Sequence, residues 1–178
     1  IRGQICAFIA GDLAYYLAHN EPREHSASGE MVKGSDVDII IILGDSLPPE
    51  LKDMIDAEMI RMKSVYLRHP DYRQEIDFIC KYQSVMERQF GYADIHDKIA
   101  SKIAYESMFL GGSLTLYMEV REAMTRLGVD KLIEADFDHA LKDRKNAMRK
   151  LLNAEPSGVI DDEMRSLFYF SQERVEFS

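Results

Sequence analysis

The sequence predicts an α/β (α+β) fold, in which a small mixed β-sheet with flanking helices is followed by a C-terminal helical bundle. Beyond about residue 93 the apolar residues recur at helical spacing, and glycines separate the segments. We therefore expect an α/β domain over residues 1–84 and a helical domain over residues 85–178. Three short apolar runs have the length and composition of buried strands: residues 5–10, 36–43 and 74–80.

The first run is continuously apolar and ends at Gly11, so it predicts a buried strand that stops at a turn. A helix is expected next, over residues 12–18, where Asp12 is suited to the N-terminal cap or the first turn. Residues 19–35 are polar, contain Pro22 and lack a regular period. Such a stretch predicts a long loop.

The second run predicts another buried strand, and Pro48 and Pro49 then open an amphipathic helix over residues 50–64. The third run is short, β-branched and aromatic, which is typical of a strand. The later helices are separated by the Gly111-Gly112 pair and by Gly128. Four of them are expected: residues 93–110, 114–127, 138–153 and 161–171.

Composition limits the classes of function. The chain is acidic, with a formal net charge of -9, which argues against sequence-independent nucleic-acid binding because that requires a basic surface. Cys6 and Cys80 each lie in an apolar run, which predicts buried free thiols and a cytoplasmic protein. No apolar stretch has the length of a membrane span, and nothing resembles a signal peptide. The histidines lack partners at metal-ligand spacing, so zinc is not expected.

Two aspartates stand where the second run begins. Successive strand residues point to opposite faces, so Asp36 and Asp38 project to the same side, where two carboxylates can share one or two divalent cations. Asp77, in the third run, adds a carboxylate on a neighbouring strand, and Glu75 on the same strand face is its rival. The alternative interpretation of the first two aspartates is a polar turn that opens a strand.

The order of these elements resembles that of the nucleotidyltransferase superfamily, which includes DNA polymerase beta, the aminoglycoside nucleotidyltransferases and small minimal nucleotidyltransferases. In that family a hydrophobic strand ends in Gly-Gly or Gly-Ser, and a strand carrying Asp-h-Asp-h follows, where h is hydrophobic. Here Gly11 ends the first strand, and residues 34–39 read Gly-Ser-Asp-Val-Asp-Ile. The resemblance covers residues 5–80 and is most specific at Asp36 and Asp38.

The resemblance implies a Mg²⁺-dependent enzyme that transfers a nucleoside monophosphate from a nucleoside triphosphate (NTP) to a hydroxyl of a small molecule or a protein. It assigns Asp36, Asp38 and Asp77 to a two-metal catalytic site, an arrangement that clamps the attacking and leaving oxygens of an in-line displacement. It also implies that the glycine–serine motifs and a lysine on the helix after the third strand contact the nucleotide. These residues are Gly11, Gly34, Ser35 and Lys102.

Two features depart from the family pattern. Asp12 follows the first glycine, where the family usually has Gly or Ser, and its charge would repel phosphates unless the side chain points away to cap its helix. The insertion at residues 19–35 lengthens the link between the two motifs. It is expected either to fold over the nucleotide, with Ser26 or Ser28 supplying the missing hydroxyl, or to be disordered.

Several other polar residues have both a functional and a structural interpretation. Lys98 and Lys102 share a helix face, which is ordinarily solvated. Tyr105 and Ser113 are candidates for a base or sugar pocket, or for the core. A basic cluster either contacts phosphate or an acidic partner, or forms the outer face of an amphipathic helix: Lys142, Arg144, Lys145, Arg149 and Lys150.

The leading hypothesis is thus a transferase whose partners are an NTP and an acceptor, with the acidic charge favouring a cationic acceptor such as an aminosugar over nucleic acid. The alternative is a non-catalytic domain of the same fold that acts through protein contacts, for instance in a toxin–antitoxin pair, and Asp12 favours it. A phosphatase of the haloacid dehalogenase type fits less well, because its acidic pair follows the apolar strand and here the pair precedes it.

Overall fold

The computed structural model describes residues 3–25 and 28–153. The chain forms two compact units, Ile1–Leu127 and Gly128–Ser178, which we consider separately. The boundary expected at residue 84 falls inside the first unit. The helix predicted at residues 161–171 lies outside the described residues.

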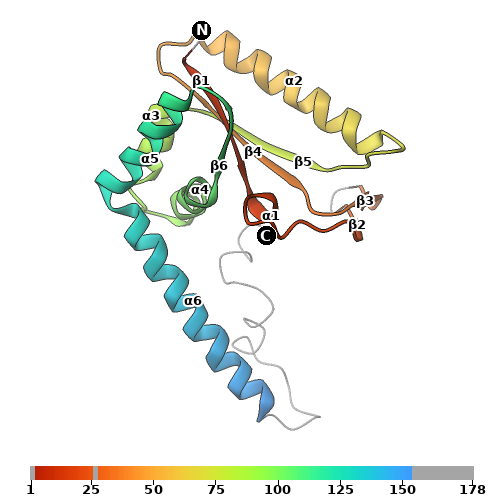
Figure 1. The fold of residues 1–178 in the computed structure, drawn as a ribbon, viewed down its shortest axis with the longest axis vertical. Coiled ribbons are helices and arrows are strands. Elements are labelled where there is room, and N and C mark those ends of the chain that lie inside the picture. The colour runs from red at the N-terminus through yellow and green to blue at the C-terminus, as the bar shows by residue number, and fades with distance from the viewer. Residues whose placement is uncertain (1–2, 26–27, 154–178) are drawn as a thin grey trace. The chain divides into compact units, whose positions relative to one another are not determined.

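A four-stranded mixed sheet organises the first unit (Figure 1). Its strands, in spatial order, are β5 (Ile76–Tyr82), β4 (Val37–Leu43), β1 (Ile5–Ala10) and β6 (Met108–Gly112). β1 runs antiparallel to both β4 and β6, whereas β4 and β5 are parallel. The predicted α+β class, a mixed sheet with flanking helices, is confirmed.

The strand β6 was not predicted. The helix expected over residues 93–110 ends early, as α4 (Ile95–Glu106), and the chain then turns into β6 and pairs with β1. Gly112 has a φ of 92°, and a Cβ atom there would collide with the carbonyl of Ile5. The close approach of this edge strand to β1 therefore requires a glycine at this position. From the sequence, the same glycine was expected only to separate two helices.

Helices lie on both faces of the sheet (Figure 1). The helix α2 (Pro49–Arg68) begins at the predicted proline pair and packs Leu51, Ile55 and Met59 against buried residues of β4 and β5. On the other face lie α3 (Gln83–Gln89), α4 and α5 (Leu114–Leu127). There the ring of Phe8 meets Tyr117 of α5 edge to face, with 5.0 Å between ring centroids.

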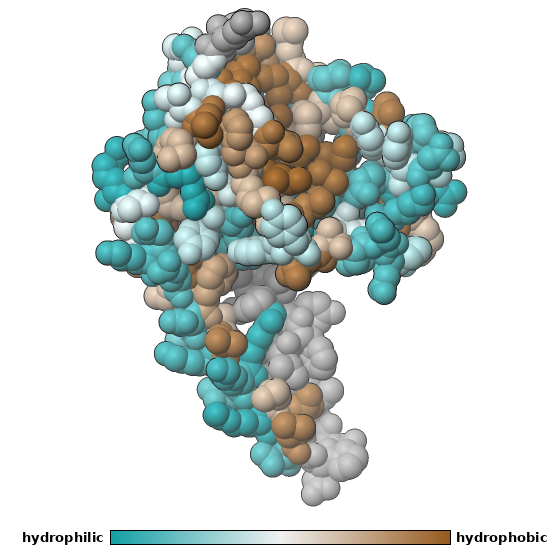
Figure 2. Space-filling view, in the orientation of Figure 1, coloured by the Kyte–Doolittle hydropathy of each residue, from teal (hydrophilic) through white to brown (hydrophobic). Residues whose placement is uncertain are grey.

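Figure 2 shows hydrophobic residues gathered over the strands, between α2 and the helices of the other face. Cys6 and Cys80 belong to this apolar interior and are buried free thiols, as predicted. Within the described ranges, no helix has both the length and the hydropathy that crossing a bilayer requires.

The helix predicted over residues 12–18 is a single turn, α1 (Gly11–Ala14). Its continuation would consist of Tyr15, Tyr16 and Leu17, which are all exposed. A helix of this length is not stable without an apolar face to pack, so the prediction was wrong for lack of a tertiary partner.

The segment at residues 19–35, predicted to be a loop, contains a β-hairpin of β2 (Pro22–Glu24) and β3 (Met31–Lys33). Val32 at its centre is buried, and the backbone N–H of Lys33 donates to the carbonyl of Arg73 at 2.9 Å. Contacts with distant parts of the first unit therefore stabilise this hairpin. Such contacts produce no local periodicity in the sequence, so the hairpin was not predicted.

The structure describes one helix in the second unit, α6 (Val129–Leu152). It begins at Val129 instead of residue 138, directly after Gly128, whose φ of 72° is in the left-handed region. The basic cluster on this helix is mostly exposed: Lys142, Lys145, Arg149 and Lys150. A C-terminal helical bundle stays a prediction.

Candidate metal centre

Three aspartates converge at one end of the sheet. Asp38 and Asp77 are the second residues of β4 and β5 and are direct partners in the parallel register. Asp36 precedes β4, two residues before Asp38. Each residue offers a carboxylate oxygen, and these three atoms lie within 4.8 Å of one another, so the group could hold a metal ion.

The alternation of strand side chains gives the triad its face. Ile41 and Cys80 belong to the hydrophobic cluster beneath α2. Asp38 lies three residues before Ile41, and Asp77 three residues before Cys80. Because strand residues an odd number of positions apart point to opposite faces, both carboxylates lie on the face of the sheet away from α2. The side chains of Asp36 and Asp77 are 41% and 44% exposed, which leaves the carboxylates open to an ion from solvent.

Gly11 lies directly against this triad. It follows Ala10, the partner of Asp38 across the antiparallel β1–β4 pair, and has a φ of 64°. A Cβ atom at Gly11 would collide with Oδ2 of Asp38. The first glycine of the motif therefore has a physical reason: any side chain would take space that the Asp38 carboxylate occupies.

Gly34 and Ser35, expected to contact a nucleotide, close the base of the hairpin. Gly34 is buried with a φ of 63°, and a Cβ atom there would collide with the carbonyl of His19. The Ser35 hydroxyl donates to Oδ2 of Asp12 at 2.9 Å and accepts from the backbone N–H of His19 at 3.3 Å. Asp12 thus lies in the first turn of α1, one of its two expected places, and does not cap the helix, whose N-cap is Ala10. Its carboxylate is held by Ser35.

Lys102, the expected phosphate contact, forms an ion pair on its own helix, with Nζ 3.6 Å from Oε1 of Glu106. The Glu106 side chain is only 9% exposed. It also interacts with Tyr15, whose side chain is about half exposed: its partial desolvation first, and then the charge and hydrogen bond of Glu106, raise the pKa of the Tyr15 phenol to about 12. To reach a phosphate, Lys102 would have to leave Glu106. Lys98 lies over the ring of Tyr92, at 4.9 Å.

The two pocket candidates serve the packing of the first unit. The Ser113 hydroxyl accepts from the backbone N–H of Leu116 at 3.2 Å, in the first turn of α5. The guanidinium carbon of Arg121 lies over the Tyr105 ring, 5.9 Å from the ring centroid. Ser28, suggested as a replacement hydroxyl, lies 2.7 Å from Nδ1 of His25, and Ser26 is outside the described residues.

Glu75, the rival third carboxylate, has a different role. Its side chain is 8% exposed and binds two residues of the hairpin: Arg23 Nη2 at 2.7 Å and His25 Nε2 at 3.2 Å. Arg23 also lies 3.8 Å from Oδ2 of Asp36, and its Nε donates to the carbonyl of Gly34 at 3.0 Å. Arg23 therefore links the buried Glu75 to the edge of the triad, a connection that no local pattern in the hairpin reveals.

Lys63 was also missed by the sequence analysis. Its ammonium group forms an ion pair with Oδ1 of Asp77. Lys63 continues, at the next i+4 position, the stripe of Leu51, Ile55 and Met59 that packs on the sheet. The sequence did contain a signal for this contact: a lysine that continues an apolar stripe lies on the helix face that packs on the sheet, and it therefore needs a polar partner there.

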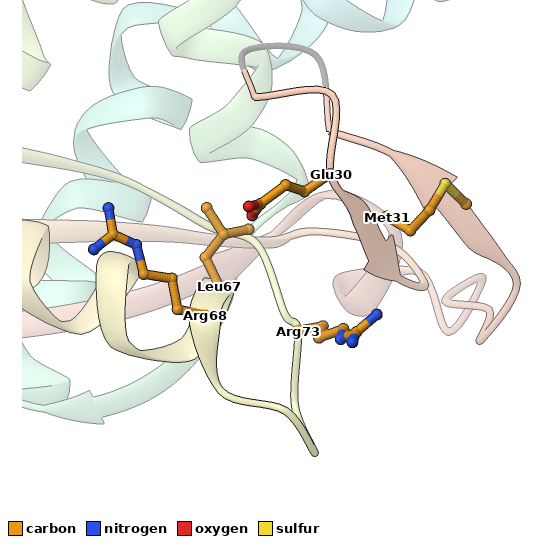
Figure 3. Close-up of a pocket in the computed structure, with 5 residues that line it drawn as sticks. All are labelled: Glu30, Met31, Leu67, Arg68 and Arg73. Carbon is orange, nitrogen blue, oxygen red and sulfur yellow. The ribbon is translucent and has the colours of Figure 1, made fainter.

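A cavity of about 390 Å³ lies where the hairpin meets the end of α2 (Figure 3). Glu30 and Met31 line it from the hairpin, Leu67 and Arg68 from the last turn of α2, and Arg73 from the segment before β5. In Figure 3 the guanidinium groups of Arg68 and Arg73 extend in opposite directions. The polar groups of this cavity therefore do not converge on one ligand position.

The fold and the site together define an α+β protein with an accessible triad of carboxylates on adjacent strands. A scan against protein-family models finds no match for this chain, and searches of curated proteins and of solved structures find no significant similarity.

Proposed function

We propose that this chain is a Mg²⁺-dependent nucleotidyltransferase, which moves a nucleoside monophosphate from an NTP to a hydroxyl of a small molecule or a protein. The observation that carries the proposal is the convergence of Asp36, Asp38 and Asp77, with donor oxygens within 4.8 Å of one another. Because a fold does not determine a function, the proposal depends on this site and on the resemblance of the motifs that build it.

The donor set suits Mg²⁺. All three groups are carboxylates, hard oxygen ligands, and two of them are partly exposed, which fits an ion that keeps several waters and also binds substrate phosphates. Three negative charges held this close repel one another, and a divalent cation relieves that repulsion. When bound, such an ion neutralises the charge that develops on a transferring phosphoryl group.

The strand pairing supports the proposal because it brings the two sequence motifs together. Ala10 pairs with Asp38, so the glycine that ends β1 lies against the first acidic strand. The parallel pairing of β4 with β5 then sets Asp77 beside Asp38. In this proposal Asp36 and Asp38 hold the metal, and Asp77 completes the ligand set or accepts the proton of the attacking hydroxyl.

The reaction forms a bond from the acceptor oxygen to the α-phosphorus and breaks the bond from that phosphorus to the bridging oxygen. Pyrophosphate leaves with the electron pair, and the hydroxyl proton passes to a carboxylate. The formal net charge of -9 favours a cationic acceptor, such as an aminosugar, because a cation is drawn to an acidic surface.

The proposal is tested by thermal unfolding of the wild type and of Asp36→Ala/Asp38→Ala with each NTP, with and without Mg²⁺. We expect an NTP to raise the melting temperature only when Mg²⁺ is present, and the double variant to lose this rise. A matched control is Glu50→Ala/Asp53→Ala, which removes two exposed charges from α2 and should behave as the wild type. If no NTP shifts the wild type with Mg²⁺, the transferase proposal is wrong.

One observation favours the alternative, a non-catalytic domain that acts through protein contacts. Cations of the chain itself lie beside the triad: Arg23 at Asp36 and Lys63 at Asp77. Such pairing would stabilise the triad in a protein that never binds metal. The same thermal-unfolding experiment separates the two functions, because the non-catalytic domain predicts no metal-dependent shift.

A further inference from the structure

We propose that Lys63 is a built-in competitor of the metal: its ammonium group occupies the Asp77 side of the triad when the ion is absent and must move away for the ion to bind. The inference rests on the proposed function in that it treats the triad as a metal site. Its subject is a residue that neither the motifs nor the resemblance assigns.

The two cations at the triad differ in how firmly they are held. Arg23 makes three interactions, with Glu75, with the carbonyl of Gly34 and with Asp36, and the Glu75 carboxylate that anchors it is buried. Lys63 is shown in one ion pair, with Asp77. Both partners of that pair are partly exposed, at 33% and 44% of their side-chain surfaces. Lys63 is therefore the cation that can be displaced at small cost.

The position of Lys63 explains how it reaches the site and how it can leave. α2 packs on the face of the sheet opposite the triad, and β5 is the end strand of the sheet. The long side chain of Lys63 nevertheless meets Asp77, at the end of the sheet where β5 begins. When it is released, the flexible four-carbon stem can carry the ammonium group back to solvent, because the side chain is already partly exposed there.

Lys63 offsets repulsion in the empty triad. The three aspartates bring three negative charges close together, and Arg23 beside Asp36 and Lys63 beside Asp77 offset part of this repulsion. A divalent cation on the same carboxylates would lie next to the ammonium group, and the two like charges cannot both stay there. Binding of the metal must therefore break the Lys63–Asp77 pair, which weakens the affinity for free metal.

The inference is tested by Mn²⁺ titration, in which the electron paramagnetic resonance signal of free Mn²⁺ reports binding without any turnover. We expect Lys63→Met to bind Mn²⁺ about three- to tenfold more tightly than the wild type, because the pair no longer has to be broken. Lys63→Arg keeps the charge and should bind as weakly as the wild type. The gain in affinity should shrink at high salt, which screens the competing charge.

The control variant is Lys52→Met, which removes a lysine of the same helix that pairs with Asp56 away from the triad. Its Mn²⁺ affinity should not change. Asp36→Ala/Asp38→Ala, introduced with Lys63→Met, should abolish the tight binding; binding that survives it would lie elsewhere and would overturn the inference. Lys63→Gln replaces Lys63→Met if circular dichroism shows that the methionine variant does not fold.

The failures of the two proposals can be told apart. If the wild type binds Mn²⁺ through the triad and Lys63→Met binds it equally or less tightly, Lys63 is not a competitor and the metal centre stands. If neither protein binds Mn²⁺, the metal centre itself is wrong, and the proposed function falls with it. A merely structural role for Lys63 predicts weaker binding in the variant, the opposite of the expected result.

Discussion

Asp38 and Asp77 are direct partners across the parallel β4–β5 pair. At the start of this pair, the backbone N–H of Val37 donates a hydrogen bond of 3.0 Å to the carbonyl of Glu75, 38 positions further along the chain. The register therefore decides whether the carboxylates meet. A slip of one residue would turn Asp77 to the face beneath α2, because strand side chains alternate. The site depends on the same hydrophobic pattern that fixes the sheet.

The first prediction separates Asp77 from its rival Glu75. In Asp77→Asn, Mg²⁺ should no longer raise the free energy of unfolding, whereas in the wild type the rise is about 2.7 kcal/mol at a metal concentration about 100 times the dissociation constant. Glu75→Gln should keep the metal-dependent rise but lose about 1–3 kcal/mol of stability, because Arg23 and His25 lose their anionic partner. Urea unfolding with Mg²⁺ and with a chelator measures both effects. A metal response lost in Glu75→Gln and kept in Asp77→Asn would reverse the assignment.

The second prediction concerns Gly11→Ala. The backbone there has a φ of 64°, and the new Cβ would meet the carboxylate of Asp38, so both stability and Mn²⁺ affinity should fall. The matched control is Gly128→Ala, at a φ of 72° with nothing within 4 Å of its Cβ. The control should lose only the backbone contribution, about 1–2 kcal/mol, and keep its Mn²⁺ affinity. Equal Mn²⁺ affinities in the two variants would show that Gly11 does not support the site.

The sequence predicts well those elements whose pattern is local. The strands β1, β4 and β5 are short, mostly apolar runs that contain isoleucine, and α2 has an apolar stripe with a proline start. The meeting of Asp36, Asp38 and Asp77 also follows from the sequence, because strand alternation and one neighbouring strand are enough to bring them together.

The elements that were missed depend on distant partners. β6 forms because β1 offers an edge to residues 108–112, of which residues 108–110 in isolation continue a helical pattern. The hairpin depends on the burial of Val32 and on the link from Arg23 to Glu75. Lys63 meets the triad because α2 packs against β4 and β5, so its role could not be read from the helix alone.

The third prediction is that Arg23 fastens the hairpin to the sheet. Arg23→Ala should lose about 1–3 kcal/mol of stability, because it leaves the buried Glu75 carboxylate without its closest cation. Amide hydrogen exchange at Val32 should accelerate, since the hairpin opens more often. Arg23→Lys should restore little, because a compact ammonium group lacks the planar fork with which the guanidinium reaches separated acceptors through Nε and Nη2.

The control for the hairpin is Arg61→Ala, which breaks an exposed pair with Glu58 on α2 and should leave both the stability and the exchange at Val32 unchanged. If Arg23→Ala behaves like this control, the salt bridge contributes nothing to the hairpin, and another contact must hold it.

The fourth prediction concerns alkaline pH. Burial raises the pKa of the Cys6 thiol from 9.0 to about 12 and that of Cys80 from 9.0 to about 11. The folded protein therefore keeps protons that the unfolded chain has already lost. Their contribution to stability is complete below pH 9.0 and is lost as the pH rises toward about 11 for Cys80 and about 12 for Cys6.

This decline is measured as the free energy of unfolding in urea at a series of pH values. Tyrosines and lysines also titrate in this range, so the informative quantity is the difference between the wild type and Cys6→Ala/Cys80→Ala. The double variant should be less stable at neutral pH, because it loses buried volume, but its stability should fall less steeply above pH 9.0. Both thiols should also react with a thiol reagent only after unfolding, since both are buried. Parallel pH profiles for the two proteins, or fast reaction of the folded wild type, would show that these thiols are not enclosed as the structure has them.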